Sequence, residues 1–437
     1  MFFEFSPYSS LLLPFFVQGV VFIVLFLVRG WQRGIASDTW LALLLLLNTL
    51  PLTQWMLGFA GWYDSHDAHS TFMFYFPFSH WLALGPTFYF YFRSLTNQDF
   101  RFGWAQKLQF LPALAYLGWR LVVFGYDVVW QHWVLGAPFT EHFGTKGPLA
   151  NVSEIADGTI EILGYLSVFA YGWLTLRDYQ RYRRYLDDNY SNTGPISFPW
   201  LRNLMVAVLV GLLVSFFFGL VNKVLTPLSY IQVWYSFLAT GLLIYYLSIA
   251  GLLAPYQPAP ALHFQPDGAE ELQPVASVAA SPTQVAKVLA PNQGGNFSEN
   301  APQRLVSDSV ELTAEIPTAP TDPDLTRWAD KLTHHMQTAR PYLNPELTLG
   351  ELANQLRTNT SLLSRVINTC FGQNFNDYIN THRIAEAERK LQDPRFQHYT
   401  LLAVALESGF NSKSTFNRVF KKLKAATPSE VAARLNT

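Results

Sequence analysis

The sequence has a single cysteine, Cys370, among its 437 residues. This scarcity excludes a framework of disulfides within the chain, and it fits a reducing compartment for the segment that holds the thiol. Charged residues are also few, at 14%. The apolar stretches show no HExxH, GxSxG or P-loop motif, no paired carboxylates and no inverted repeat. These absences argue against an intramembrane enzyme or a transporter, so we expect no catalytic activity and no cofactor.

Apolar and aromatic side chains, by contrast, are abundant and unevenly distributed. Hydrophobic residues make up 50% of the chain, and the 35 Phe, 21 Tyr and 13 Trp concentrate before Gly251. The net charge of the whole chain, −1, gives no sign of this uneven distribution. The composition predicts a membrane part followed by soluble parts, with domains at residues 1–254, 255–323 and 324–437.

Seven runs of the first part are long and apolar enough to cross a bilayer, which takes about 20 residues in a helix. They lie at residues 9–28, 39–60, 71–92, 108–124, 155–176, 204–224 and 231–253. The first run is interpreted as a retained helix rather than a signal peptide, because Glu4 precedes it and Arg29 and Arg33 follow it. The predicted fold class is all-α, beginning with a seven-helix transmembrane domain.

Basic residues beside the predicted helix ends set the orientation. Alternate loops carry ten Lys and Arg residues, whereas the other loops carry Lys146 and Lys223. Because basic flanks stay in the cytoplasm, this bias predicts an outside N-terminus and, with seven spans, a cytoplasmic C-terminal part. The expected location is a bacterial inner membrane that the chain crosses several times.

A loop on the predicted outer side contains Asp64, His66, Asp67 and His69. These residue types can bind a metal ion, but loops are normally polar, and nothing in the sequence fixes a ligand geometry here. We therefore expect no metal site there.

Three acidic residues lie on one face near the outer start of the predicted fifth helix. They are Glu154, Asp157 and Glu161, at positions i, i+3 and i+7. Ionisable groups at membrane depth suggest a ligand-sensing site, which would bind a cation or pair with Lys223. Alternatively, these acids simply favour the positive end of the helix dipole in the headgroup layer.

Residues 255–323 are rich in Pro, Ala, Gln and Ser, with eleven prolines and no sustained period, which predicts a disordered linker. Its eight acidic and two basic side chains give a net charge of −6, which disfavours contact with DNA or anionic lipid. A flexible chain of this length spans roughly 45 Å. Such a tether would lose any twist of the membrane helices, so a signal would act through local concentration, pairing of chains or release.

The pattern becomes helical and compact after Pro323, and two similar units follow. In the first, Thr348 and Glu351 form a predicted capping box before one helix, and a second helix begins after Asn359. In the second, Thr400 caps a helix, Gly409 makes the turn and another helix starts at about residue 412. Both units have the layout of a helix-turn-helix, whose second helix lies in the DNA major groove.

A long helix predicted at residues 376–391 joins the two units and spans about 24 Å. Two reading helices held apart by such a rigid element would enter successive major grooves, which lie about 34 Å apart. One chain is therefore expected to read two half-sites.

The charge of this last part suits DNA. Residues from 323 onward carry fifteen Lys and Arg against ten Asp and Glu, and the segment 413–424 has five basic residues and no acid. The basic residues are Lys413, Arg418, Lys421, Lys422 and Lys424. Phosphate contact would make the affinity strongly dependent on salt, whereas a basic helix standing alone would more simply be a solvated face.

Two stretches of this part resemble a known family, the AraC/XylS-type transcriptional regulators of bacteria. They read PYLNPELTLGELANQLRTNTSLLSRVINTCFGQNFNDYINTHRIAEAERKL and LLAVALESGFNSKSTFNRVFKKLKAATPSE, about a quarter of the chain. The second has Gly409-Phe410, Phe416, Arg418, Phe420-Lys421 and Thr427-Pro428 where the family has them. Ala426 departs from the pattern, because a Gly usually precedes Thr-Pro, and we expect this change to tighten the turn. The membrane half is similar to seven-helix sensor regions that precede this domain in some regulators.

The resemblance implies which side chains contact bases. Those on the first reading helix are Ser361, Ser364 and Arg365, and those on the second are Ser414, Thr415, Asn417 and Arg418. Lys413, Lys421 and Lys422 are expected at phosphates. The two arginines have the fork that reads guanine, although either could instead hold a phosphate or a neighbouring carboxylate.

Together these observations predict a membrane-anchored transcription regulator. Its expected partners are promoter DNA, the lipid bilayer, an unknown small-molecule or membrane signal and, as an open question, a second copy of the chain. One alternative is a transporter or intramembrane enzyme with a regulatory DNA-binding tail. Another is that the membrane helices only anchor the regulator.

Overall fold

The computed structural model describes residues 6–97, 100–194, 196–222, 228–253, 264 and 323–435. Within these ranges the regular structure is helical, and β contacts are confined to isolated bridges. The all-α fold class is therefore confirmed for the described part of the chain. The predicted linker at 255–323 lies outside it, apart from Phe264 and the first residue of the C-terminal domain.

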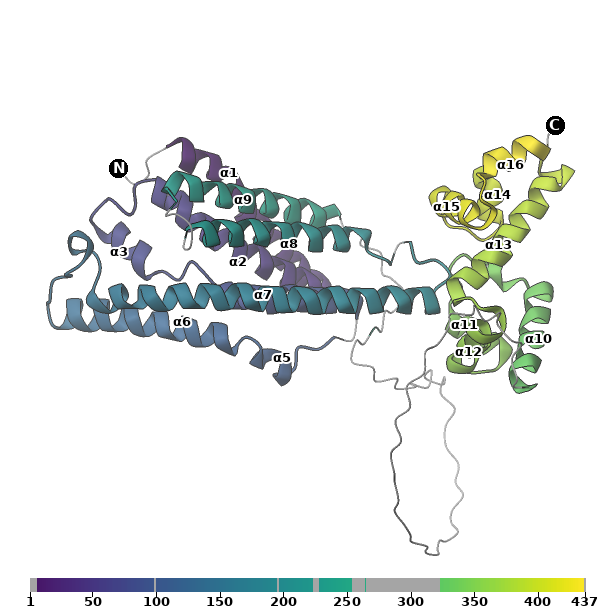
Figure 1. Ribbon diagram of the computed structural model, residues 1–437, viewed down its shortest axis with the longest axis horizontal. Coiled ribbons are helices and arrows are strands. Elements are labelled where there is room, and N and C mark those ends of the chain that lie inside the picture. The colour runs from purple at the N-terminus through teal and green to yellow at the C-terminus, as the bar shows by residue number, and fades with distance from the viewer. Residues whose placement is uncertain are drawn as a thin grey trace, which may run out of the picture.

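The N-terminal half is a bundle of long helices that run along the length of the molecule (Figure 1). Among the described residues, five helices are long and apolar enough to cross a membrane. They are α1 (Pro7–Arg33), α2 (Ala36–Phe59), α7 (Pro148–Asn189), α8 (Pro199–Leu220) and α9 (Tyr230–Leu253). The shorter helices are α3 (Ala68–Tyr75), α4 (Trp81–Thr96), α5 (Trp104–Leu108) and α6 (Leu111–Phe124).

The third and fourth predicted spans differ from the structure. Residues 71–92 do not form one helix, because α3 ends at Tyr75 and the backbone of the next residue, Phe76, is extended with ψ 129°. The following Pro77 disfavours helical geometry at the residue before it. The run 108–124 forms α6, whose 14 residues continue as a π-helix at Gly125–Val134. Five helices, rather than the predicted seven, thus meet the length and composition of a span.

Glycines allow α4 and α7 to pack closely. A Cβ on Gly164 of α7 would lie 2.3 Å from the Cβ of Trp81. A Cβ on Gly85 of α4 would lie 3.1 Å from the Ser167 carbonyl oxygen. Small residues at such crossings let helix backbones approach, which is how helices associate in a lipid environment.

A charged contact joins α1, α2 and α9 at the end of the bundle that is rich in basic residues. The Arg29 guanidinium donates two hydrogen bonds of 2.6 Å to the Asp38 carboxylate. It donates a third, of 3.2 Å, to the Gly251 carbonyl. Asp38 is only 4% exposed, so this ion pair is largely buried and holds the three helices together at this end of the bundle.

The outward faces of the bundle are apolar. Val17, Val21 and Val24 of α1 are each at least half exposed, as are Val210 and Phe217 of α8. A helix on the surface of a water-soluble bundle would carry polar residues on that side. The exposed apolar faces therefore fit a lipid surrounding.

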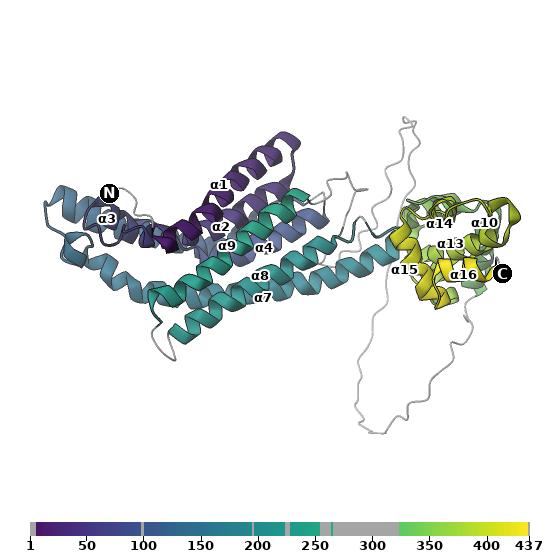
Figure 2. The same cartoon turned by 90° about the horizontal axis from the view of Figure 1, so that it is seen from above.

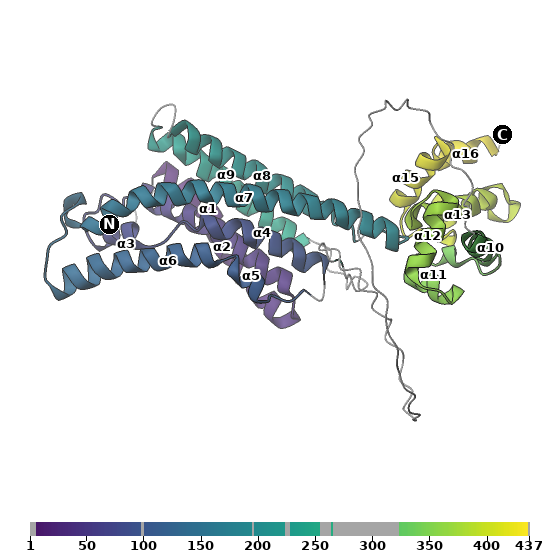
Figure 3. The same cartoon turned by 60° about the horizontal axis from the view of Figure 1, so that its bottom comes forward.

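Helix α7 is the longest element, with 42 residues. At 1.5 Å per residue it extends about 63 Å, roughly twice the 30 Å of a hydrocarbon core. All three views show it running through the bundle and ending beside the C-terminal domain (Figures 1, 2 and 3). Its last turns carry four arginines, Arg177, Arg181, Arg183 and Arg184.

The C-terminal domain is built from seven helices and two short turns. The helices are α10 (Pro323–Thr338), α11 (Leu349–Leu356), α12 (Thr360–Phe371), α13 (Phe375–Gln392), α14 (Leu401–Glu407), α15 (Lys413–Lys424) and α16 (Pro428–Leu435). One apolar core lies under α10 to α12, and a second lies under α14 and α15. The long α13 contributes to both cores, and neither core takes a residue from the described part of the N-terminal half.

Arg383, in the middle of α13, is the most constrained charged side chain of this domain. It is only 2% exposed, and burial lowers its pKa to about 10, so it stays protonated at neutral pH. Its guanidinium donates hydrogen bonds of 2.8 Å to the carbonyls of Tyr342 and Asn344. It also lies 5.9 Å from the ring centre of Phe410 in the second unit. Arg383 thus fixes the segment that leads into the first unit and lies beside a ring of the second.

We expect Arg383→Met to lower the free energy of unfolding of the C-terminal domain by roughly 2 to 4 kcal/mol, because it leaves two carbonyls without their donors. Urea unfolding of residues 323–437 measures the change. Arg395→Met is the matched control: Arg395 is 79% exposed and pairs with Asp393 within the 3-10 turn, so its loss should cost less than about 0.5 kcal/mol. Equal effects of the two substitutions would contradict the role given to Arg383.

Candidate functional site

The first helix-turn-helix unit consists of α11 and α12. The hydroxyl of Thr348 accepts a hydrogen bond of 3.2 Å from the Glu351 N–H, and the Glu351 carboxylate accepts one of 3.0 Å from the Thr348 N–H. These bonds confirm the predicted capping box. The Asn359 side chain caps α12 by accepting from the Leu362 N–H at 2.7 Å. The buried face of α12 carries Leu363, Val366 and Ile367.

The second unit consists of α14 and α15 and has the same layout. Thr400 and Ser412 cap the two helices by accepting hydrogen bonds of 3.1 and 3.2 Å from backbone N–H groups three residues later. Gly409 makes the turn with φ 90°, and a Cβ there would lie 2.3 Å from the Tyr342 carbonyl oxygen. Only glycine fits this position. The buried face of α15 carries Phe416, Val419 and Phe420.

The predicted DNA-contact residues lie on the opposite faces of the two second helices. On α12, Ser361 and Arg365 are exposed and Ser364 is half-buried. On α15, Thr415 is half-buried and the others are exposed, namely Lys413, Ser414, Asn417, Arg418, Lys421 and Lys422. Each second helix therefore separates an apolar inner face from a polar outer face, as groove insertion requires. Their contact with bases and phosphates stays a prediction.

Two lysines of α15 pair with acids of α13. Lys422 Nζ lies 2.7 Å from Asp377 Oδ1, and Lys424 Nζ lies 2.7 Å from Glu388 Oε2. Pairs as exposed as these contribute about 0 to 1 kcal/mol. Either lysine can therefore exchange its carboxylate for a phosphate at little cost.

The turn after α15 differs from the expectation for Ala426. The residue with left-handed backbone is Ala425, with φ 54°, one position earlier. Its N–H donates to the Lys421 carbonyl and closes the helix. A left-handed alanine costs about 1 kcal/mol or more, so the strain of this turn lies at Ala425.

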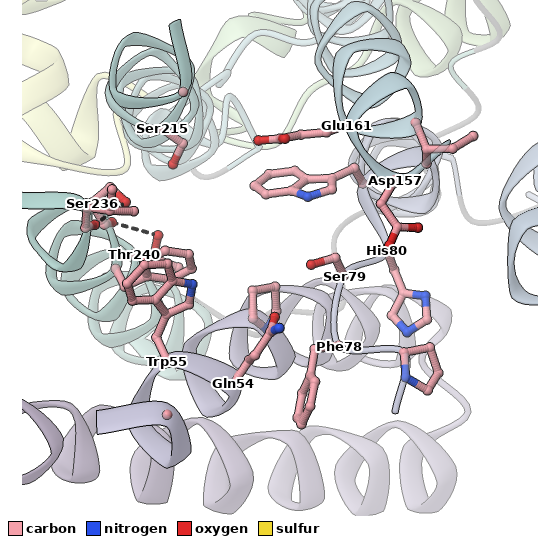
Figure 4. A pocket seen from close by; sticks show the side chains of 18 of the residues that line it. Gln54, Trp55, Phe78, Ser79, His80, Asp157, Glu161, Ser215, Ser236 and Thr240 are labelled. Carbon is pink, nitrogen blue, oxygen red and sulfur yellow. Dashed lines mark hydrogen bonds between the residues drawn. The ribbon is translucent and has the colours of Figure 1, made fainter. Parts of the chain in front are cut away.

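A second candidate site is a cavity of 960 Å³ inside the N-terminal half. It lies between α2, α4, α6, α7, α8 and α9, toward the end of the bundle away from the C-terminal domain. Figure 4 shows Glu161 and Asp157 of α7 facing the cavity across from Trp55 and Gln54 of α2. Its size is that of a small-molecule site.

The three acids predicted for ligand sensing all line this cavity, whereas Lys223 lies outside the described residues. Asp157 accepts hydrogen bonds from Tyr116, at 2.8 Å, and from Arg120, at 3.3 Å. Glu154 pairs with Lys146, a residue that is 5% exposed. These basic partners were not predicted from the sequence. Arg120 interrupts an apolar run, however, and a charged residue at membrane depth suggests an acidic partner.

The loop with Asp64, His66, Asp67 and His69 has a structural role. The Asp67 carboxylate caps α3 by accepting from the His69 N–H at 2.8 Å, and it lies 2.9 Å from the His69 ring. Among the described residues, no three His, Cys, Asp or Glu side chains come together as metal ligands. The capping bond accounts for Asp67 without a metal ion.

Comparisons with known proteins match the C-terminal domain. A family model described as a helix-turn-helix domain matches residues 352–434. The probable transcription factor PqrA of Proteus vulgaris is 30% identical over 87 residues, which are 20% of this chain and 69% of that protein. An uncharacterized HTH-type transcriptional regulator of Staphylococcus aureus (strain COL) is 30% identical over 89 residues, which are 20% of this chain and 12% of that much longer protein. No solved structure matches the chain.

Substitutions on the two reading helices should separate base contact from phosphate contact. We expect Arg365→Ala to cost roughly 1 to 3 kcal/mol on the preferred site and to relax specificity at one base pair. Lys421→Ala should weaken binding to all sequences about equally and reduce the salt slope by about 1. Fluorescence anisotropy with matched and mismatched duplexes at several salt concentrations measures both. A uniform loss for Arg365→Ala would show that this arginine holds a phosphate.

Proposed function

Because the chain belongs, through its C-terminal domain, to the AraC-type helix-turn-helix transcriptional regulators, we propose that it is a membrane-anchored, non-enzymatic transcription regulator. It reads promoter DNA with α12 and α15. The observation that carries this proposal is the presence, in one chain, of two helix-turn-helix units and five helices suited to a membrane.

The arrangement around α13 supports reading by a single chain. This helix has 18 residues and is about 27 Å long. It contributes to both apolar cores, so the two units are held by one rigid element. Reading helices fixed in this way can address two successive major grooves, which lie about 34 Å apart.

We also propose seven crossings of a bacterial inner membrane, with the N-terminus outside. The helix α4 and the continuous helix formed by α6 and the π-helix would supply the two crossings beyond the five long apolar helices. The basic residues at the end of α7 support a cytoplasmic location for the C-terminal domain.

The cavity in the membrane half supports a sensor role rather than a mere anchor. Four carboxylates line it, those of Asp64, Glu154, Asp157 and Glu161, against one arginine, one lysine and two histidines. Arg120 and Lys146 each pair with a carboxylate of the lining. Aromatic rings such as Trp55 and Trp81 line the same space. An excess of negative charge beside aromatic faces favours a small organic cation as the signal.

DNA binding is tested on the fragment 323–437, whose two cores are complete without the membrane half. We expect specific binding to an upstream genomic fragment in a gel-shift assay. Its affinity should fall roughly a thousandfold between 50 and 200 mM salt, because several phosphates are neutralised. Equal affinity for all fragments, or an affinity insensitive to salt, would contradict the proposal.

Ligand binding is tested by calorimetry on the purified full chain with benzyltrimethylammonium and its uncharged isostere. We expect saturable binding of the cation and at least tenfold weaker binding of the isostere. Glu161→Gln should weaken binding of the cation about tenfold, because it removes a carboxylate of the lining. Glu141→Gln removes an acid outside the cavity and is the control. Equal binding of cation and isostere would contradict the charge preference.

A further inference from the structure

The C-terminal domain contacts the end of α7 directly, through residues that follow the helix. Tyr190 forms an isolated antiparallel bridge with Thr348, the residue that caps α11. Next to it, the Ser191 N–H donates a hydrogen bond of 3.2 Å to the Leu347 carbonyl. The chain thus pairs one extended residue of the membrane half with the edge of the first helix-turn-helix unit.

Two side chains of α13 bind the same extended segment. The Asn376 side chain donates hydrogen bonds of 3.0 and 2.9 Å to the carbonyls of Tyr190 and Ser191. The Arg383 guanidinium donates to the carbonyl and the hydroxyl of Ser191, at 3.3 and 3.0 Å. Ser191 is only 3% exposed. This contact is therefore a built binding site for backbone groups, not a chance touch of two surfaces.

The segment on either side of Ser191 lies near the second reading helix. Asp187, in the last turn of α7, interacts electrostatically with Arg418 and Lys422 of α15. Beyond Ser191, a Cβ on Gly194 would lie 3.8 Å from the Thr415 hydroxyl oxygen, at van der Waals distance. Thr415, Arg418 and Lys422 occupy positions i, i+3 and i+7, so they share one face of α15.

We propose that residues 187–194 are an internal ligand of the DNA-binding domain, which holds the domain against the end of α7 beside α15 and keeps the docked protein from binding its operator. This inference rests on the proposed function, because docking beside α15 matters only if that helix reads DNA. Docking and DNA binding are then mutually exclusive.

The exclusion follows from charge and from space. Asp187 interacts electrostatically with basic residues that are expected at phosphates or bases, so a DNA strand that approached them would also meet this carboxylate. The backbone at Gly194 lies close to the Thr415 hydroxyl, and a major groove admits a helix only when DNA can reach its outer face.

The docking segment is joined to the cavity by one uninterrupted helix. Glu161 lines the cavity and Asp187 lies in the last turn of α7, and the helix rises about 39 Å over the 26 positions between them. A rotation or shift of α7 on ligand binding would therefore move the docking segment. The signal would therefore control whether the C-terminal domain is released from this segment.

A disulfide that locks the docked state tests the proposal. Opposed residues of an antiparallel bridge have Cα atoms about 4.5 to 5.5 Å apart, which suits a disulfide. Tyr190→Cys and Thr348→Cys are combined with Cys370→Ser in the full chain in nanodiscs, and neither cysteine replaces a predicted DNA contact. Operator affinity is measured for the oxidised and the reduced forms of this one protein. We expect the oxidised form to bind at least tenfold more weakly.

A charge reversal tests release in the opposite direction. Asp187→Lys places a cation against Arg418 and Lys422, and we expect the full chain to bind the operator three- to tenfold more tightly. Asp188→Lys is the matched control, because it adds the same charge one residue further on while the electrostatic partners of Asp188 are Asp187 and Arg184 of α7 itself. The control should stay within twofold of the unaltered chain.

The fragment 323–437 separates this inference from the proposed function. If the fragment binds the operator and the oxidised, locked full chain binds it as tightly as the reduced chain does, the docked state is compatible with DNA and the inference is overturned. Equal gains for Asp187→Lys and Asp188→Lys would overturn it too, since a general attraction to DNA would explain both. If the fragment binds no DNA, the proposed function itself fails, and the inference with it.

Discussion

The guanidinium of Arg383 is the group around which the C-terminal half is organised. Its five N–H donors lie in one plane, so their partners fix its direction as well as its position. They reach the carbonyls of Tyr342 and Asn344, which precede the first unit, and the carbonyl and hydroxyl of Ser191 in the N-terminal half. The ring of Phe410 in the second unit lies beside them. A lysine could make one of these contacts, but it could not orient all of them.

The continuity of α7 changes how the two halves communicate. The disordered linker predicted at residues 255–323 could not carry a twist, so the sequence left local concentration, pairing of chains or release as the mechanism. The structure adds a second connection, in which one helix carries the cavity acids in its first turns and the docking segment at its end. Under the proposed docking, release is a change at a defined contact, after which the domain stays covalently joined to the N-terminal half.

Features that depend on nearby residues could be predicted from the sequence. The caps at Thr348, Asn359, Thr400 and Ser412 need a polar side chain two or three residues before a backbone N–H, and all four are present. The prediction of one continuous helix at residues 71–92 was wrong, although Pro77 marks the break between α3 and α4 in the sequence. Contacts between distant segments had weaker signals in the sequence or none. Arg383 lies on the apolar face of α13, so its burial could have been suspected. Nothing in the sequence links Ser191 to Leu347.

The strength of the docked state is limited by the contacts that form it. The hydrogen bonds to Tyr190 and Ser191 contribute about 1 kcal/mol each at most, and ordering the segment offsets part of that gain. A net docking energy of about 2 to 3 kcal/mol would weaken operator binding roughly 30- to 150-fold, since every 1.4 kcal/mol is tenfold. Specific DNA affinities are far larger than this, so docking can tune binding without abolishing it. A ligand coupling of 1 to 3 kcal/mol, which is typical, is then enough to reverse the state.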